Sequence, residues 1–208
     1  MAWNCKATGA YSRESAEALN NARNAYAILS SRGWTLAAFS AMWGNVEHES
    51  GYNPWRWQSD SVQYSDSPNI NIQSGHAYGL VQWDPAAKYI TGGRNYSGYA
   101  PNFADQSGSV TDGSAQLNFL DDTAVSSGQY ITSSAYPINY AAFKTATTDQ
   151  YTIDWLTRAW FRNYERGTWS DSRSAAAAYW YETLSGETPH GKIPIWLLFK
   201  LKERNSNV

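Results

Sequence analysis

The spacing of apolar residues predicts helices in the first quarter of the chain. Apolar side chains recur every three or four residues over 12–31 and again over 35–50, which is the period of a helix with one buried face. Gly33 separates the two segments, and Thr35 is a suitable N-cap for the second. Gly51 follows that segment, as glycine commonly does at a helix C-terminus. The pattern therefore predicts two consecutive helices, the second of which ends at about residue 50.

The middle of the chain has a different pattern. Residues 58–79 are rich in Ser, Asn, Asp and Gln, with short alternations of apolar and polar residues at 61–64 and 69–72. Such alternation within a polar stretch predicts a weak β-hairpin in an irregular loop. A short helix is predicted over 84–90, because Asp-Pro is a good helix start, and 91–112 is again a polar loop.

The helical period returns in the second half, over 114–124, 148–164 and 171–184. We therefore expect a mainly α fold with a small β-hairpin region. It would form a single domain over 1–191, followed by an apolar C-terminal segment over 192–208. That segment either packs against its own domain or docks onto a partner protein.

Composition and charge exclude several classes of protein. The 208 residues carry 16 Lys and Arg against 18 Asp and Glu, a net charge of −2, so the main role is not to bind nucleic-acid phosphates. No apolar run approaches the roughly 18–20 residues that span a bilayer. Residues 1–11 do not resemble a secretory signal, and the single Cys5 suits a protein made in a reducing cytoplasm.

Two glutamates and a histidine occupy the last turn of the second predicted helix. At roughly 100° per residue, His48 lies opposite Phe39 and faces water, while Glu47 and Glu49 flank the apolar stripe. The negative end of the helix and partial burial would both raise the pKa of Glu49. A general acid that works near neutral pH needs such a pKa. The alternative is that both glutamates are solvated side chains without a chemical role.

A second candidate region is the apolar stretch 77–85, which places Gln82 and Trp83 directly before the predicted short helix. An amide and an indole are the groups that bind a sugar's hydroxyls and its apolar face. The alternative is a core strand that ends in a buried tryptophan. The chain contains 11 Trp and 15 Tyr, more than a core requires. We therefore expect a sugar-stacking surface around Glu49, formed by aromatic residues in or beside the loops: Trp55, Trp57, Tyr78 and Trp83.

The order of these motifs resembles a known signature. Glu-Ser-Gly-Tyr-Asn-Pro at 49–54 is followed about 30 residues later by Gly-Leu-Val-Gln-Trp at 79–83, then by motifs at 115–120 and 160–166. This is similar to the bacteriophage tail lysozyme family and, more distantly, to goose-type lysozymes and lytic transglycosylases. The resemblance runs from about residue 21 to 186, most of the chain.

The resemblance implies a lysozyme-like α+β fold that cleaves the β-1,4 bond between N-acetylmuramic acid and N-acetylglucosamine. By position, Glu49 would be the catalytic acid. The residues implied to contact substrate are Ser50, Tyr78, Gln82, Trp83, Tyr164 and Glu165. It also implies a virion protein that acts on the bacterial wall without a cofactor, with peptidoglycan strands and other phage tail proteins as partners.

The residues leave the mechanism open. A second carboxylate could activate water or act as nucleophile, and the candidates are Asp60, Asp66, Asp84 and Glu165. If none reaches the cleft, the 6-hydroxyl of muramic acid could attack instead, as in a lytic transglycosylase. A glycan-binding or structural tail-tip protein without activity is a further alternative.

Two other cell-wall chemistries are weakly supported. A cysteine peptidase would have to pair Cys5 with His76, but nothing near Cys5 would lower its pKa. A zinc site needs convergent ligands, and His48, His76 and His190 are scattered without a ligand motif. We therefore expect no metal.

Overall fold

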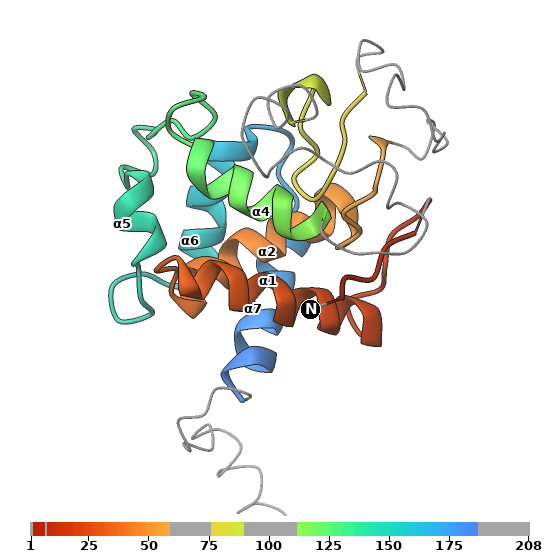
Figure 1. Ribbon diagram of the computed structural model, residues 1–208. Helices are drawn as coiled ribbons and strands as arrows, with labels where there is room; N and C mark the ends of the chain where they lie inside the picture. Colours follow the sequence, from red (N-terminus) through yellow and green to blue (C-terminus); the bar gives the residue numbers. More distant parts are fainter. Residues whose placement is uncertain (1, 7, 59–75, 90–111, 187–208) are drawn as a thin grey trace, which may run out of the picture.

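The computed structural model describes residues 2–6, 8–58, 76–89 and 112–186, and shows a mainly helical protein (Figure 1). Within these ranges there is no strand; Tyr78 forms isolated antiparallel bridges with Trp57 and Trp83. The elements with bounds are α1 (Ala16–Ser31), α2 (Leu36–Ser50), α4 (Asp112–Thr123), α5 (Tyr140–Lys144), α6 (Ile153–Trp160), the π-helix η3 (Phe161–Glu165) and α7 (Ser172–Ser185).

The mainly α prediction is confirmed, and the β-hairpin stays a prediction because 61–64 and 69–72 lie outside the described residues. The apolar segment 192–208 also lies outside them. Three consecutive helical residues, 87–89, agree with the short helix expected over 84–90.

Capping side chains explain where the helices begin. The first helix starts at Ala16 rather than at residue 12, because the Ser15 hydroxyl accepts a hydrogen bond from the backbone N–H of Ala18. Thr35 caps α2 as expected, accepting from Ala38 N–H. The helix expected over 148–164 begins only at Ile153, where Thr152 is the cap, and changes to π geometry after Trp160. The short helix α5 was not predicted.

Helix α2 is the central element, with α1, α6 and α7 packed around it (Figure 1). Every residue from Ala37 to Val46 is buried, so this helix is covered on all sides except in its last turn. Gly44 allows α7 to approach closely. A Cβ at this position would lie 2.6 Å from the backbone nitrogen of Ala177 and from the carbonyl oxygen of Arg173.

Aromatic rings fill most of the core. Trp43 stacks between Phe39 and Tyr52, with ring centroids 5.5 Å apart in each pair, and Trp180 meets the edge of Tyr52. A second group of rings joins α5, α6 and the segment after α1; its members include Trp34, Tyr130, Tyr140, Phe143 and Trp160.

The four rings assigned to the expected sugar-stacking surface are mostly covered, and that surface stays a prediction for which Trp83, on a cavity wall, is the best placed of the four. Trp55, Trp57, Tyr78 and Trp83 are all 5% exposed or less. The reason is that these rings pack on one another and on neighbours: Trp57 lies 4.7 Å from Tyr78, and Trp83 lies 4.7 Å from Tyr89. Most of the aromatic excess therefore serves packing.

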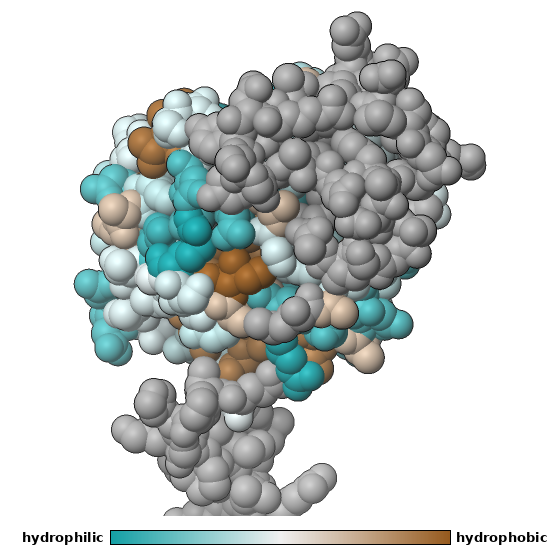
Figure 2. Space-filling view, viewed as in Figure 1, coloured by the Kyte–Doolittle hydropathy of each residue, from teal (hydrophilic) through white to brown (hydrophobic). Residues whose placement is uncertain are grey.

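Little large apolar surface is exposed. On the face shown in Figure 2 the described surface is mainly hydrophilic, with a few small hydrophobic patches. Among the described residues, Val125 and Ile131 are the large apolar side chains that stand exposed. No helix within the described ranges is both long and apolar enough to cross a bilayer.

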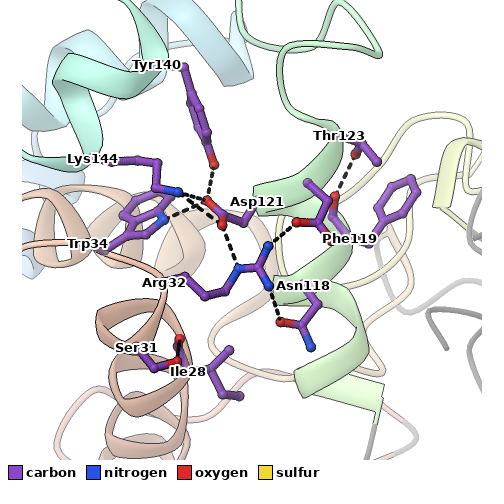
Figure 3. A network of polar contacts seen from close by, with 11 residues as sticks. Ile28, Ser31, Arg32, Trp34, Asn118, Phe119, Asp121, Thr123, Tyr140 and Lys144 are labelled. Carbon is purple, nitrogen blue, oxygen red and sulfur yellow. Dashed lines mark hydrogen bonds and ion pairs between the residues drawn. The ribbon is translucent and has the colours of Figure 1, made fainter.

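A buried carboxylate on α4 connects three parts of the fold (Figure 3). Asp121 accepts hydrogen bonds from Arg32 Nε at 2.6 Å, Trp34 Nε1 at 2.8 Å and Tyr140 Oη at 2.9 Å, and pairs with Lys144 Nζ at 2.8 Å. Burial alone would raise the pKa of Asp121, but these four donors together lower it. The network therefore fixes the end of α1 and the start of α2 against α4 and α5.

We expect Asp121→Asn to lower the free energy of unfolding by about 2 kcal/mol at neutral pH, because it leaves the half-buried Arg32 and Lys144 without their carboxylate. A lowered native pKa contributes stability above the unfolded pKa and loses it as pH falls through the native one. The difference in unfolding free energy between the wild type and Asp121→Asn should therefore become smaller below about pH 4. Urea unfolding from pH 7 to pH 3 measures it. Asp122→Asn, at a more exposed position, is the control and should cost about 1 kcal/mol or less.

We expect Gly44→Ala to destabilise the protein by about 1–3 kcal/mol, because the methyl group would force α2 and α7 apart. Gly186→Ala is the matched control. There the nearest atom would be 3.7 Å from the new Cβ, and the backbone has an ordinary helical φ of −70°. Equal loss in the two variants, measured by thermal unfolding, would contradict the close helix contact.

Candidate active site

One cavity of about 280 Å³ is lined by four polar residues that the sequence singled out: Glu49, Gln82, Asp84 and Glu165. Its wall comes from the end of α2, the turn before residue 89, the loop after α4 and the end of η3. The lining residues are Glu49, Val81, Gln82, Trp83, Asp84, Lys88, Gln129, Glu165, Arg166 and Gly167. Three of them are carboxylates and two are cations.

The last turn of α2 sends its two glutamates to different places. Glu49 lines the cavity, whereas Glu47 pairs with Arg13 at 2.6 Å and accepts a hydrogen bond from the Tyr52 hydroxyl. His48 is exposed, as predicted. Gly51 ends the helix with a left-handed φ of 54°. The two glutamates therefore point in different directions from the same helical turn, and Glu49 is the one that reaches the cavity.

Arg173 of α7 is the partner of Glu49. Its Nη2 donates to Glu49 Oε1 at 2.7 Å and lies 3.0 Å from His48 Nδ1, while Nη1 donates to Asn45 Oδ1 at 3.1 Å. The guanidinium also lies 4.9 Å from the ring centre of Phe161. Arg173 is 2% exposed, so a buried positive charge holds one oxygen of the cavity's Glu49.

Sequence analysis missed Arg173. The available signal was an arginine at the start of an alanine-rich helix, Ser-Arg-Ser-Ala-Ala-Ala-Ala, where a buried charge implies a buried partner. That signal does not say which carboxylate is the partner, because the two residues are 124 positions apart.

Glu165 reaches the same cavity through the π-helix. Backbone N–H of Arg166 donates to the carbonyl of Phe161 at 2.7 Å, five residues back, and the Trp160 indole donates to Glu165 Oε1 at 3.0 Å with the same spacing. Trp160 and Tyr164 stack with centroids 4.4 Å apart. An α-helical turn would not pair residues at this spacing, so the π geometry directs the carboxyl group.

The surroundings of Glu165 favour the protonated form of its carboxyl group. Burial raises its pKa well above the usual range, and the negative charge of nearby Glu49 raises it further. The Trp160 hydrogen bond and the charges of Arg173 and Arg166 oppose this without cancelling it. The cavity thus places an acid that is hydrogen bonded to an arginine beside a second acid whose pKa is raised.

The turn that carries Gln82 and Trp83 is held from behind by a residue with no role assigned from the sequence. Gln116 of α4 accepts from Leu80 N–H at 2.7 Å and donates to the Pro54 carbonyl at 2.6 Å. The Gln82 amide donates to the carbonyls of Gly79 and Arg56, and its backbone has a φ of 46°. Both side chains brace this wall of the cavity against the loop after α2.

The structure brings together four of the expected site residues and leaves three outside the cavity wall. Glu49, Gln82, Trp83 and Glu165 line the cavity. Ser50, Tyr78 and Tyr164 are at most 2% exposed and do not line it. Ser50 bonds the Val46 carbonyl of its own helix, and Tyr164 packs on Trp160. These three support the wall from the core.

The remaining candidates divide between the cavity and other places. Asp84 lines the cavity, while Asp60, Asp66 and His190 lie outside the described residues. Neither Cys5 nor His76 lines the cavity. Within the described ranges, no group of three His, Cys, Asp or Glu side chains is placed to hold a metal ion.

Comparisons with known proteins found a matching family model and a similar phage protein. A family model described as phage tail lysozyme matches residues 20–184. A relative named morphogenesis protein 1, from Bacillus phage B103, is 30% identical over 174 residues. The match covers 82% of this chain and 41% of that relative, so the chain spans less than half of the relative's length.

We expect Arg173→Met to destabilise the protein by about 3 kcal/mol, because it leaves Glu49 without its cation beside Glu165. Glu49→Gln in the Arg173→Met background should recover part of this loss, by about 1–3 kcal/mol. Urea unfolding of the wild type, the two single variants and the double variant completes this double-mutant cycle and gives the coupling energy of the ion pair. Strict additivity of the two losses would show that the ion pair contributes nothing.

Proposed function

Because this chain belongs to the phage tail lysozyme family, we propose that it cleaves the β-1,4 bond between N-acetylmuramic acid and N-acetylglucosamine in peptidoglycan. Peptidoglycan hydrolysis is the role to which the family points. The observation that carries the proposal for this chain is the placement of Glu49 and Glu165 on one cavity in opposite electrostatic environments.

Glycoside hydrolysis needs one neutral carboxyl group and one carboxylate, since the first protonates the leaving oxygen and the second meets the developing positive charge or activates water. A pair of acids whose surroundings favour different protonation states meets this requirement. Burial raises the pKa of Glu165 and so favours its neutral form, while the Arg173 guanidinium donates a hydrogen bond to one oxygen of Glu49. This supports Glu165 as the proton donor and Glu49 as the charged partner.

The resemblance implies the reverse for Glu49, which by position in the motif would be the acid. Both assignments place Glu49 at the reacting bond, so Glu49 remains our first catalytic residue. The two assignments differ in which residue is the acid. The acid is not needed when the leaving group requires no protonation. An aryl glycoside with an acidic phenol as leaving group therefore separates them.

Hydrolysis is favoured over the transglycosylase reaction because Glu165 and Asp84 share the cavity with Glu49. A second acidic group is what water activation requires, whereas attack by the muramic acid 6-hydroxyl needs only the acid. Mass spectrometry of the products distinguishes the outcomes: reducing muramic acid ends mark hydrolysis, and 1,6-anhydro ends mark the transglycosylase.

We further propose that the protein acts on the host cell wall as part of a phage particle. The family and the Bacillus phage relative, itself named a morphogenesis protein, both support a phage origin. Other phage tail proteins are the partners that such a location would require.

We expect Glu49→Gln and Glu165→Gln each to reduce the lysis of purified peptidoglycan by roughly 10²–10⁴-fold, because each removes one member of the acid–base pair. Binding to the same material in a pull-down should persist in both variants. On the aryl glycoside, the variant that lacks the acid should keep most of its activity. Wild-type lysis should fall as pH rises through the raised pKa of Glu165, since the donor then loses its proton.

Glu47→Gln is the matched control, because Glu47 lies on the same helical turn but is bonded to Arg13 outside the cavity. It should retain activity close to that of the wild type. Undiminished lysis by Glu49→Gln would refute the proposed site, and released peptides without glycan cleavage would refute the glycosidase function.

A further inference from the structure

A second cavity of about 240 Å³ adjoins the first. The two cavities share four lining residues: Trp83, Lys88, Gln129 and Arg166. Beyond this junction, the second cavity is lined by Phe119, Ser127 and Gly128. A ligand longer than one sugar ring that enters the first cavity can therefore continue into the second.

The charges of the two cavities differ. Glu49, Asp84 and Glu165 line the first, whereas the described residues that line the second include no carboxylate. Lys88 and Arg166 stand at the junction, and both are exposed. Within the described part of the chain, neither takes part in an ion pair. Two cations are thus available at the junction, on the wall that the second cavity shares with the first.

The backbone at Arg166 indicates that its side chain has a use. The residue has a φ of 60° at the end of η3, the left-handed conformation that glycine or asparagine adopts most easily at a helix end. Arg166 occupies this position although a residue with a Cβ is disfavoured there. Strain of this kind is characteristic of sites where a side chain is needed in one place.

The rest of the second cavity suits a sugar with an acidic substituent. Trp83 and Phe119 meet edge to face, with centroids 5.8 Å apart, and offer an apolar wall. The amide nitrogen of Gln129 donates to the Tyr164 carbonyl, so its oxygen is left to accept a hydrogen bond. An anion bound in the second cavity would meet two cations and, among the described residues that line it, no carboxylate.

From this arrangement, we propose that Lys88 and Arg166 form an anion subsite for a carboxylate carried by muramic acid, either on its lactyl group or on the attached peptide. This inference rests on the proposed function, because it takes a peptidoglycan strand as the ligand. It makes the two cations the residues that distinguish peptidoglycan from neutral chitin, which has the same β-1,4 linkage but no acid.

Binding is measured in the Glu49→Gln background, so that no ligand is cleaved. Tryptophan fluorescence or calorimetry gives Kd for three tetrasaccharides: chitotetraose, a peptidoglycan fragment without peptides, and the same fragment with its peptides. Arg166→Gln and Lys88→Gln should each weaken binding of the acidic ligands about tenfold, as expected for the loss of a charge-assisted hydrogen bond. Chitotetraose affinity should change less than twofold.

The two peptidoglycan fragments identify the source of the anion. An effect confined to the peptide-free fragment assigns the lactyl carboxylate, and an effect confined to the peptide-bearing one assigns the peptide. Arg162→Gln is the matched control: it removes an exposed arginine from the same π-helix that does not line either cavity. It should leave all three affinities unchanged.

An equal loss for all three ligands, or no loss for any, would overturn the subsite. Either result is separable from failure of the proposed function, which is judged by glycan cleavage with the wild-type protein. If Arg166 acted only through the effect of its charge on Glu165, its substitution would also weaken the binding of chitotetraose. The comparison between ligands therefore isolates the direct contact of Arg166 with the anion.

Discussion

The buried guanidinium of Arg173 is the interaction on which the organisation of the site depends. It bonds Asn45 and Glu49 of α2 from α7, and the Phe161 ring covers it from η3. A buried charge is costly unless it is paired and hydrogen bonded, so these three elements must keep their mutual positions for Arg173 to be tolerated. The absence of a side chain at Gly44 brings α7 close enough for this contact. One glycine and one arginine thus fix the position of Glu49.

Local signals in the sequence predicted much of the fold. Thr35 and Gly51 mark the ends of α2 because capping is decided by the residues at the helix terminus themselves. The same local geometry gave the outward direction of His48. Glu49 was predicted to lie at the end of this helix for the same reason, and it lines the cavity that also holds Gln82, Trp83 and Glu165.

Contacts between distant residues could not be predicted in this way. The pairing of Arg173 with Glu49 and the raised pKa of Glu165 depend on how α2, η3 and α7 pack, which no short pattern encodes. The π-helix could not be predicted either. It lengthens the hydrogen-bond spacing by one residue within a segment whose apolar pattern is that of a single helix. The aromatic residues misled for a related reason: tryptophans near polar loops suggested a surface, yet their rings close the core beneath it.

Glu47 and Glu49 show how the surroundings determine what a carboxylate can do. They lie two positions apart on one helix, and each is paired with one arginine. Glu47 also binds the Tyr52 hydroxyl, which itself accepts a hydrogen bond from Trp180, so its bonds complete a structural network. Glu49 instead shares its cavity with Glu165, whose pKa is raised by burial. Since an arginine partner is common to both, the second acid in the cavity, rather than the ion pair, is what distinguishes the surroundings of Glu49 from those of Glu47.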